Sequence, residues 1–352
     1  MPSVSIIIPI FNVRSFIQRG LTNVLKQSYQ DFEIILVDDG STDGSSKLCD
    51  EWAKGDGRIR VFHKENCGAG SARNLGIERA KGKYIYFFDI DDLADNDLLE
   101  YCVKTMEDSS ADMMVFSYRN LDLSIGQGYE TVLDDITIND NIELRNIFID
   151  QFVLKMNGFP WNKMYRKSFV DEHHLRFEDL LIQQDEVFNL GAYPFVNKAV
   201  ISSRVLYSYY IYNKGNTRSL FIANRFDIYK TVHQRFNTLK DYWKIDDARF
   251  DGYLLRRLWN NTISGFLQNI KSSGCKWSQK DKQDEINRIA DDVTIQRAMA
   301  YIMPSSGLEQ RLYMNAIQSK SLSRFLCVNS LFSFLHKCSN LVRHELREKN
   351  PS

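Results

Sequence analysis

Short runs of consecutive apolar residues alternate with longer segments of helical periodicity through the first half of the chain. The runs VSIIIPI from Val4 and FEIILVDD from Phe32 are rich in Ile and Val, which is typical of strands that helices cover on both faces. Between them, apolar residues recur at helical spacing at Phe16, Ile17, Leu21, Val24 and Leu25. Strands that alternate with helices predict an α/β fold with a mostly parallel central sheet, joined by right-handed crossovers and flanked by helices.

The pattern changes in the second half of the chain. From about Asn120 to Tyr212 strand and helix signals are mixed, and from about Arg225 onward helical periodicity dominates. One predicted helix face carries Ile228, Val232, Phe236 and Leu239, and another carries Leu254, Leu255, Leu258, Ile263 and Phe266. The C-terminal part is therefore predicted to be mainly helical.

The length of 352 residues favours two domains over one. We place an α/β domain at residues 1–220, with halves at about 1–120 and 121–220. A helical C-terminal region follows at 221–352. Its last segment, 320–349, combines a helical stripe of Leu and Phe with more basic than acidic residues. This segment is predicted either to pack on the rest of the chain or to lie on an anionic membrane surface.

Acidic residues follow two of the predicted strands. Asp38 and Asp39 end one strand, and Asp89, Asp91 and Asp92 follow another in the stretch YIYFFDIDDLADNDLLE, which contains no Lys or Arg. Because the carboxyl ends of parallel strands lie on one edge of the sheet, where ligands of open α/β sheets bind, both groups should face one crevice. Neighbouring carboxylates repel one another, so we expect a cation, a proton or a helix terminus beside them to neutralise part of the charge.

The second acidic group predicts a divalent metal site. Asp95 or Asn96 as a helix cap, with Asp97 in the first turn, explains the later acids structurally. A calcium loop of the EF-hand type is excluded, because the alternating ligands stop at Leu93 and no central glycine follows. A magnesium or manganese ion shared with substrate phosphates fits better, since such ions take one or two carboxylates and complete their shell with phosphate and water oxygens.

The same stretch permits a second interpretation. FFDIDDL resembles the aspartyl-phosphate motif of haloacid-dehalogenase-type phosphatases, in which the first aspartate, here Asp89, is the nucleophile. Those enzymes carry the motif on the first strand and continue with a small polar pair, whereas here it follows several strand–helix units and precedes Leu93. A phosphatase stays as an alternative, and so does a non-catalytic carbohydrate-binding protein.

Two further positions along the predicted crevice suit a nucleotide. A carboxylate at Asp39 can accept a hydrogen bond from the N3–H group of a uracil ring. The segment NCGAGSARNLG is a weak dinucleotide fingerprint, because Arg73 stands where a third glycine is needed, but it places that arginine near the start of a helix.

Asp185 and Glu186 in QQDEVFNL are, by themselves, typical of a solvated helix face.

Taken in order, these motifs closely resemble the large inverting glycosyltransferase family two, with the Rossmann-like GT-A fold for nucleotide sugars. Similarity is dense from Val4 to about Asp97. It resumes in PWNKMYRKSF, LRFEDLLIQQDEVFN and LYSYYIYNKGNTRS, so that roughly the first 220 residues are covered. The resemblance implies a nucleotide-binding first half and an acceptor-binding second half of the α/β domain.

The resemblance also implies roles for individual residues. The nucleotide site would comprise Pro9, Phe11, Asn12, Asp39, Arg73 and Asp89. Asp89, Ile90 and Asp91 match the DxD motif, and Asp91 or the adjoining Asp92 would hold the metal, Mn²⁺ or Mg²⁺. Asp185 aligns with the catalytic base. Most members have Glu before this aspartate, whereas this chain has Gln184 before it and Glu186 after it, which leaves the base role open to Glu186.

The implied activity is metal-dependent inverting transfer of a hexosyl or N-acetylhexosaminyl group from a UDP-sugar. The implied acceptor is a glycan or a polyprenyl-linked saccharide, in the assembly of bacterial capsule, exopolysaccharide or O-antigen. Trp161 in FPWNKMY either packs in the core, as a tryptophan commonly does, or lies beside the acceptor and stacks on its sugar ring.

Composition narrows the location and the partners. Lys plus Arg and Asp plus Glu number 45 each, so no global field would attract nucleic acid. The six cysteines form no CxxC pair, the N-terminus lacks the basic region of a signal peptide, and no stretch approaches the roughly 20 apolar residues of a spanning helix. We expect a cytoplasmic chain with reduced thiols, or a peripheral one at the inner face of the cell membrane.

Overall fold

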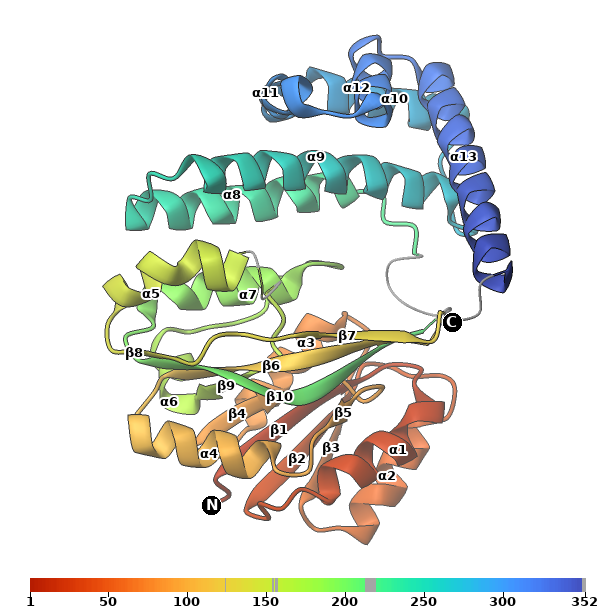
Figure 1. The fold of residues 1–352 in the computed structure, drawn as a ribbon. Coiled ribbons are helices and arrows are strands. Elements are labelled where there is room, and N and C mark those ends of the chain that lie inside the picture. The colour runs from red at the N-terminus through yellow and green to blue at the C-terminus, as the bar shows by residue number, and fades with distance from the viewer. Residues whose placement is uncertain (124, 154, 156–157, 213–219, 350–352) are drawn as a thin grey trace. The chain divides into compact units, whose positions relative to one another are not determined.

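The computed structural model (Figure 1) describes the backbone of residues 1–123, 125–153, 155, 158–212 and 220–349, with side chains up to residue 335. The chain divides into two compact units. The first comprises Met1–Asn216 and Gln234–Ile245, and the second comprises Thr217–His233 and Asp246–Ser352.

A parallel block of four strands begins the first unit. The strands are β1 (Val4–Ile10), β2 (Phe32–Asp38), β3 (Ile59–His63) and β4 (Tyr84–Phe87), in the order β3-β2-β1-β4. All three neighbouring pairs are parallel, with Ile10 opposite Asp38 and Ile7 opposite Phe87. The predicted α/β architecture is confirmed, and β1 lies between the two strands that carry the acidic residues.

The sheet continues beyond β4 in mixed orientation. Its remaining strands are β5 (Leu93–Ala94), β6 (Met113–Asp122), β7 (Gln127–Thr131), β8 (Ile136–Ile138), β9 (Lys163–Arg166) and β10 (Ala199–Ile211). The order runs β4-β9-β6-β10-β5, with β7 on β6 and β8 on β10. β9 is antiparallel to both neighbours, whereas β6 and β10 are parallel to each other. A single reversed strand thus joins two parallel parts.

Helices cover both faces of the sheet. They are α1 (Arg14–Leu25), α2 (Ser45–Gly55), α3 (Ala69–Arg79), α4 (Leu98–Ser109), α5 (Asn141–Ile147), α6 (Lys167–Glu172) and α7 (Gln184–Ala192), with a π-helical turn at Phe148–Val153 and a 3₁₀ turn at Tyr193–Phe195. Ile6 and Ile8 of β1 share a buried cluster with Leu21 of α1 and Leu99 of α4. The intervening Ile7 faces Gly76 of α3. This alternation explains why the strand sequence is apolar throughout.

The second unit is helical, as predicted. Its helices are the start of α8 (Arg225–Trp243), then α9 (Ala248–Lys271), α10 (Gln279–Asp291), α11 (Val293–Ile302), α12 (Leu308–Gln318) and α13 (Leu322–Lys349), with a 3₁₀ turn at Met303–Ser305. The predicted apolar positions of α8 and α9 are all buried. Ser278 and Asp281 form a reciprocal capping box that begins α10. Within the described residues, no helix is long and apolar enough to cross a membrane.

Candidate functional site

The two acidic segments flank β1 at the carboxyl edge of the parallel block. Asp39 follows β2, and its backbone N–H donates to the Ile10 carbonyl at 2.8 Å. Phe88 follows β4, and its N–H donates to the Ile7 carbonyl at 3.0 Å. Because β1 bonds to both segments, their side chains start from the same edge of the sheet, as the sequence predicts.

Asp39 organises the loop that leads into α3. Its Oδ1 accepts from Lys64 Nζ at 2.7 Å and from the Cys67 N–H at 3.0 Å, and its Oδ2 accepts from the Gly68 N–H at 2.7 Å. The residue is only 2% exposed. The predicted uracil contact stays a prediction. A nucleobase at this position would meet a carboxylate that already accepts three hydrogen bonds.

The first loop supplies the other predicted nucleotide contacts. Asn12 has a left-handed backbone with φ of 52°, and its Oδ1 accepts from the Thr42 N–H at 2.8 Å. This bond ties the loop after β1 to the turn after β2. Phe11 is 47% exposed, so its ring is available to a base, whereas Pro9 lies within β1 opposite Val37.

Arg73 pairs with Asp89, at the carboxyl edge of the sheet, and with Asp185, the predicted catalytic base. It is buried in α3, where Nη2 donates to Asp89 Oδ1 at 2.9 Å and Nη1 donates to Asp185 Oδ1 at 2.8 Å. The guanidinium also lies 5.4 Å from the centroid of the Phe177 ring. Such planar, two-pronged pairing suits arginine and not lysine. The sequence predicts that Arg73 binds the nucleotide, but it gives no sign that this residue connects two distant carboxylates.

Asp185 stands in the first turn of α7. Burial raises the pKa of its carboxyl, while the charge of Arg73 opposes that rise. The Asp185 carbonyl accepts from Asn189 Nδ2 at 3.0 Å, and the same amide donates to the Gly158 carbonyl at 2.6 Å. Among the described residues, Oδ1 of Asp185 accepts from Arg73 and no hydrogen bond is formed to Oδ2. One oxygen is held and the other remains available to take a proton.

The start of α7 lies close to the start of α3. A Cβ atom added to Gly70 would lie 2.2 Å from Gln184 Oε1 and 3.0 Å from Phe177 Cβ, so a larger residue would require the Gln184 side chain to move. Gln184 is the residue that replaces the usual Glu of the family motif, and it packs at this crossing. Glu186, the alternative base, packs its aliphatic carbons against Gly158. Because Arg73 contacts Asp185, the geometry favours Asp185 over Glu186 as the base.

Asp92 is enclosed. Its Oδ2 accepts from the Tyr207 hydroxyl at 2.7 Å, its Oδ1 accepts from the Tyr210 N–H at 2.8 Å, and the residue is 1% exposed. These bonds attach the acidic loop to β10. Because both oxygens already accept hydrogen bonds within the fold, the geometry favours Asp91 over Asp92 as the residue that contacts the ion, and the metal-binding role of either residue stays a prediction.

Asp91 is left as the acid that suits a metal. It is partly exposed, and burial together with the charge of Asp89 raises its pKa to about 6. Burial is the larger cause of this rise in pKa, and the charge of Arg19 opposes it. In the described part of the chain, no three His, Cys, Asp or Glu residues gather into a metal site. Asp91, with the second oxygen of Asp89, still fits Mn²⁺ or Mg²⁺, which need only one or two carboxylates beside substrate phosphates.

Trp161 is a core residue. It is 2% exposed, and its ring stacks on Tyr207 at 4.6 Å and on Phe159 at 4.7 Å between centroids. The prediction of direct stacking on the acceptor sugar is therefore wrong for this arrangement, because protein rings occupy its faces. The alternative prediction of core packing is confirmed.

Lys163 is a buried cation that sequence reasoning did not single out. It is 0% exposed, and Nζ donates to Asn162 Oδ1 at 2.8 Å and to the Phe159 carbonyl at 2.5 Å. Burial lowers its pKa to about 7, although the charges of Asp185 and Glu186 act against that shift. The available signal was a lysine set among apolar residues in PWNKMY.

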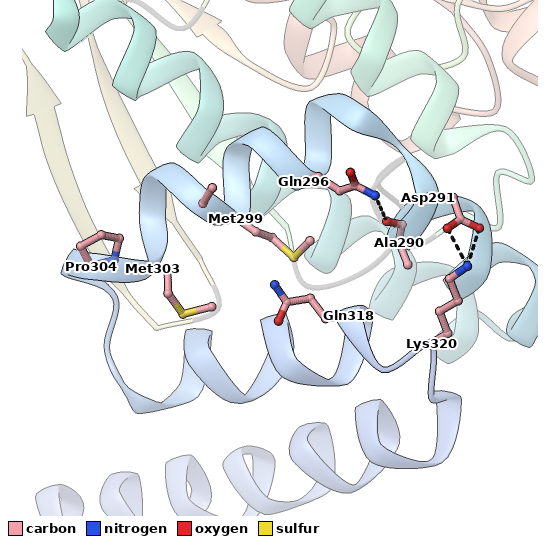
Figure 2. Close-up of a pocket in the computed structure, with 9 residues that line it drawn as sticks. Ala290, Asp291, Gln296, Met299, Met303, Pro304, Gln318 and Lys320 are labelled. Atoms are coloured by element: carbon pink, nitrogen blue, oxygen red, sulfur yellow. Dashed lines mark hydrogen bonds and ion pairs between the residues drawn. The ribbon is translucent and has the colours of Figure 1, made fainter.

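A separate cavity lies in the helical unit (Figure 2). It has a volume of about 540 Å³ and is lined from α10, α11, α12 and the adjoining turns. Met299 and Met303 supply apolar surface, and Asp291 pairs with Lys320 at 2.6 Å on one side. None of the predicted site residues lines this cavity, so it contributes nothing to the carboxylate site.

Comparison with known proteins defines the family. The family model described as Glycosyl transferase family 2 matches residues 5–173. EpsH of Bacillus subtilis (strain 168) is 32% identical over 222 residues, which cover 60% of this chain and 61% of EpsH. An uncharacterized glycosyltransferase of Haemophilus influenzae is 31% identical over 212 residues, 57% of this chain and 82% of that protein. The chain belongs to glycosyltransferase family 2.

The chain spans only part of some relatives. It matches about three fifths of EpsH and 31% of the glycosyltransferase GlyA of Streptococcus pneumoniae, which is 31% identical over 221 residues and 60% of this chain. Among solved structures, S. aureus TarS 1–349 in complex with UDP-GlcNAc superposes with a TM-score of 0.65 at 20% identity, over 95% of this chain and 92% of that one. This likeness confirms the predicted GT-A type of fold.

Proposed function

We propose that this protein is a metal-dependent inverting glycosyltransferase that uses a UDP-sugar. One observation carries the proposal: Arg73 binds Asp89 on the donor edge and Asp185, the base, at the same time. The acceptor would be a glycan or a lipid-linked saccharide in the assembly of a bacterial surface polysaccharide. The complexes of TarS with UDP-GlcNAc and with UDP support the choice of a uridine nucleotide as the donor.

The donor would lie along the carboxyl edge of the parallel block. Phe11 and Asn12 would border the nucleobase, and Asp39 shapes the loop that leads into α3. Asp91, together with the Asp89 oxygen that does not accept from Arg73, would hold Mn²⁺ or Mg²⁺. When bound, such an ion neutralises the diphosphate and eases its departure as a Lewis acid. The Mn²⁺ in the complex of the mannosyltransferase PcManGT with GDP-Man, at a TM-score of 0.51 and 14% identity, comes from a distant structure and leaves the choice of ion open.

Asp185 would act on the acceptor. Its Oδ2 removes the proton of the attacking hydroxyl, the hydroxyl oxygen bonds to the anomeric carbon, and the bond from that carbon to the diphosphate oxygen breaks. Attack opposite to the leaving group inverts the configuration. Arg73 holds Oδ1 and thereby fixes the carboxylate in place. A positioned base of this kind typically contributes about 10²–10⁴-fold in rate.

A transfer assay tests this function. The protein is incubated with a panel of nucleotide sugars, an acceptor mixture and Mn²⁺ or Mg²⁺, and the nucleoside diphosphate released is measured. We expect release from a UDP-sugar that depends on the ion. Asp185→Asn should lower turnover by about 10²–10⁴-fold while the fold and donor binding persist.

Three results would contradict the proposal. A wild-type rate in Asp185→Asn would exclude that residue as the base. Phosphate release without a sugar nucleotide would favour the phosphatase alternative, and saccharide binding without any diphosphate release would favour the binding-protein alternative. Membership of family 2 is an argument against both.

The location of the protein is also part of the proposal. We place it at the cytoplasmic face of the cell membrane, where a lipid-linked acceptor would be found. On α13, Leu331, Phe334 and Leu335 are exposed at helical spacing. Such a stripe suits the surface of a bilayer. The basic residues predicted to accompany it, from Lys337 on, lie outside the residues whose side chains are described.

A further inference from the structure

Three elements meet at the main-chain carbonyl of Asp91. Arg19 of α1 donates from Nη2 to this carbonyl and, at 2.6 Å, to the hydroxyl of Tyr212, which follows β10. The Tyr212 hydroxyl in turn donates to the same carbonyl at 2.9 Å. Arg19, Tyr212 and the Asp91 peptide therefore form a closed triangle of hydrogen bonds, which we call the Asp91 brace.

Aromatic rings hold the guanidinium of the brace in place. Its central carbon lies 4.8 Å from the centroid of the Tyr210 ring and 5.8 Å from that of Phe16. The rings of Phe16 and Tyr212 pack 5.0 Å apart. A planar guanidinium packed against aromatic rings gains cation–π energy and loses conformational freedom. The brace is thus ordered by packing as well as by hydrogen bonds.

Helix α1 packs closely against the acidic loop at Gly20. A Cβ atom added to Gly20, beside Arg19, would lie 2.4 Å from the Ile90 carbonyl oxygen. Only glycine permits this contact. The helix that positions Arg19 at the Asp91 carbonyl therefore also packs against Ile90, the residue before Asp91.

The brace leaves the carboxylate of Asp91 free. Arg19 forms no ion pair with a carboxylate in the part of the chain that the structure describes, and no other side chain there donates to the Asp91 carboxylate. The next residue, Asp92, is fixed to β10 through both of its oxygens. The loop is consequently held through its main chain and through Asp92, while the Asp91 carboxylate feels the charge of Arg19 but accepts no hydrogen bond from another side chain among the described residues.

We propose that Arg19 and Tyr212 are positioning residues, which hold the Asp91 peptide so that its carboxylate is presented to the divalent ion and the donor diphosphate. This inference rests on the proposed function. Fixing the carbonyl restrains the backbone torsion ψ of Asp91, and with it the direction of the Cα–Cβ bond from which the carboxylate extends. A role confined to joining α1 to β10 would instead change stability and leave ion affinity unaltered.

Substitutions separate the two roles. Arg19→Ala removes two bonds of the triangle, and Tyr212→Phe removes the hydroxyl but keeps the ring. Loss of a group that orients a metal ligand typically lowers metal affinity about 10–100-fold. We expect a loss of that size for Arg19→Ala and smaller losses for Tyr212→Phe and for Arg19→Lys, which can still donate to the carbonyl. Lys26→Ala, an exposed cation just beyond the same helix, is the matched control and should bind normally.

The measurement is calorimetric titration of Mn²⁺ into the full-length protein saturated with UDP, together with the melting temperature of each variant. If folded Arg19→Ala and Tyr212→Phe bind Mn²⁺ with wild-type affinity, the proposed positioning role of Arg19 and Tyr212 is wrong, whatever the melting temperatures of the variants. Should Arg19→Ala fail to fold, Tyr212→Phe, which differs by one oxygen atom, decides alone. If UDP binding by the wild type does not depend on Mn²⁺, the proposed function is wrong, and the positioning role that rests on it fails as well.

Discussion

Arg73 illustrates how a single side chain can join two parts of a site. Its guanidinium is buried between Asp89 and Asp185, so its charge is compensated on both sides. Removing one partner of a buried ion pair typically costs about 3–5 kcal/mol, because the other charge is left desolvated. Substitution of Arg73 would leave both carboxylates unpaired and disturb the fold as well as the chemistry, whereas Asp185→Asn leaves Arg73 paired with Asp89 and is the cleaner test.

Lys163 presents the opposite case, a buried cation whose two acceptors are neutral oxygens. Its pKa is about 7 in the folded protein against an ordinary 10.5. Between these values the unfolded chain holds a proton that the folded chain lacks, so the free energy of unfolding rises with pH. The slope is at most about 1.4 kcal/mol per pH unit. Lys163→Met keeps the volume but cannot titrate, so it should lose this slope.

Urea unfolding at pH 6.5 and pH 9 measures the effect of Lys163→Met. The wild type should gain stability relative to this variant as pH rises, and the variant should be the more stable protein at pH 6.5. Lys47→Met, at a side chain that is 86% exposed, is the control and should follow the wild type at both values. Parallel pH dependence of wild type and Lys163→Met would show that Lys163 titrates normally.

At the scale of elements, the position of α3 depends on its contact with β1. A Cβ atom added to Gly76 would lie 2.3 Å from Ile7 Cγ2. Alanine is favoured over glycine in a helix by about 1 kcal/mol, but overpacking a core costs about 1–3 kcal/mol. We expect Gly76→Ala to be destabilising overall, and to reduce activity because α3 carries Arg73.

Chemical denaturation tests this contact, with Gly55→Ala as the matched helix substitution. Apart from its chain neighbours and the backbone of its own helix, no atom of the described residues lies within 4 Å of a Cβ added to Gly55 at the end of α2. That variant should stay within about 0.5 kcal/mol of the wild type or exceed it. Equal stability of the two variants would show that α3 can move away from β1 without cost.

The elements themselves were predictable because their pattern is local. Continuous Ile and Val runs predict β1 and β2, and the parallel topology then places Asp39 and Asp89 on one edge. The partners of these acids were not predictable. Asp92 is enclosed by Tyr207 and Tyr210 of β10, and Arg73 reaches Asp185, both from segments more than a hundred residues away. Such pairings depend on how the sheet assembles, which periodicity does not encode.

At the scale of the whole molecule, charge offers no general attraction to a surface. Basic and acidic residues are equal in number, so membrane association must be local. The exposed apolar stripe of α13 is the local feature proposed for it. Replacing Phe334 and Leu335 together by Glu removes two side chains that would enter the bilayer, each worth about 1.5–3 kcal/mol when fully buried.

Sedimentation with vesicles containing anionic lipid measures this association. The double variant should bind at least about tenfold more weakly than the wild type. Leu308→Glu is the control, because Leu308 is 69% exposed and lies outside α13. Equal binding by the double variant would exclude the stripe as the contact, and no binding by the wild type would exclude membrane association under these conditions.

The account as a whole rests on a divalent ion that Asp91 helps to hold against a nucleotide diphosphate. Calorimetric titration of UDP, with and without Mn²⁺, tests this directly in the wild type and in Asp91→Asn. Asp97→Asn is the control, since that acid comes from the same stretch but pairs with Arg204. We predict that Mn²⁺ strengthens UDP binding about tenfold or more in the wild type and in Asp97→Asn, and that Asp91→Asn loses this gain. The account would be contradicted if Mn²⁺ does not change the UDP affinity of the wild type, or if Mn²⁺ raises the UDP affinity of Asp91→Asn as much as that of the wild type.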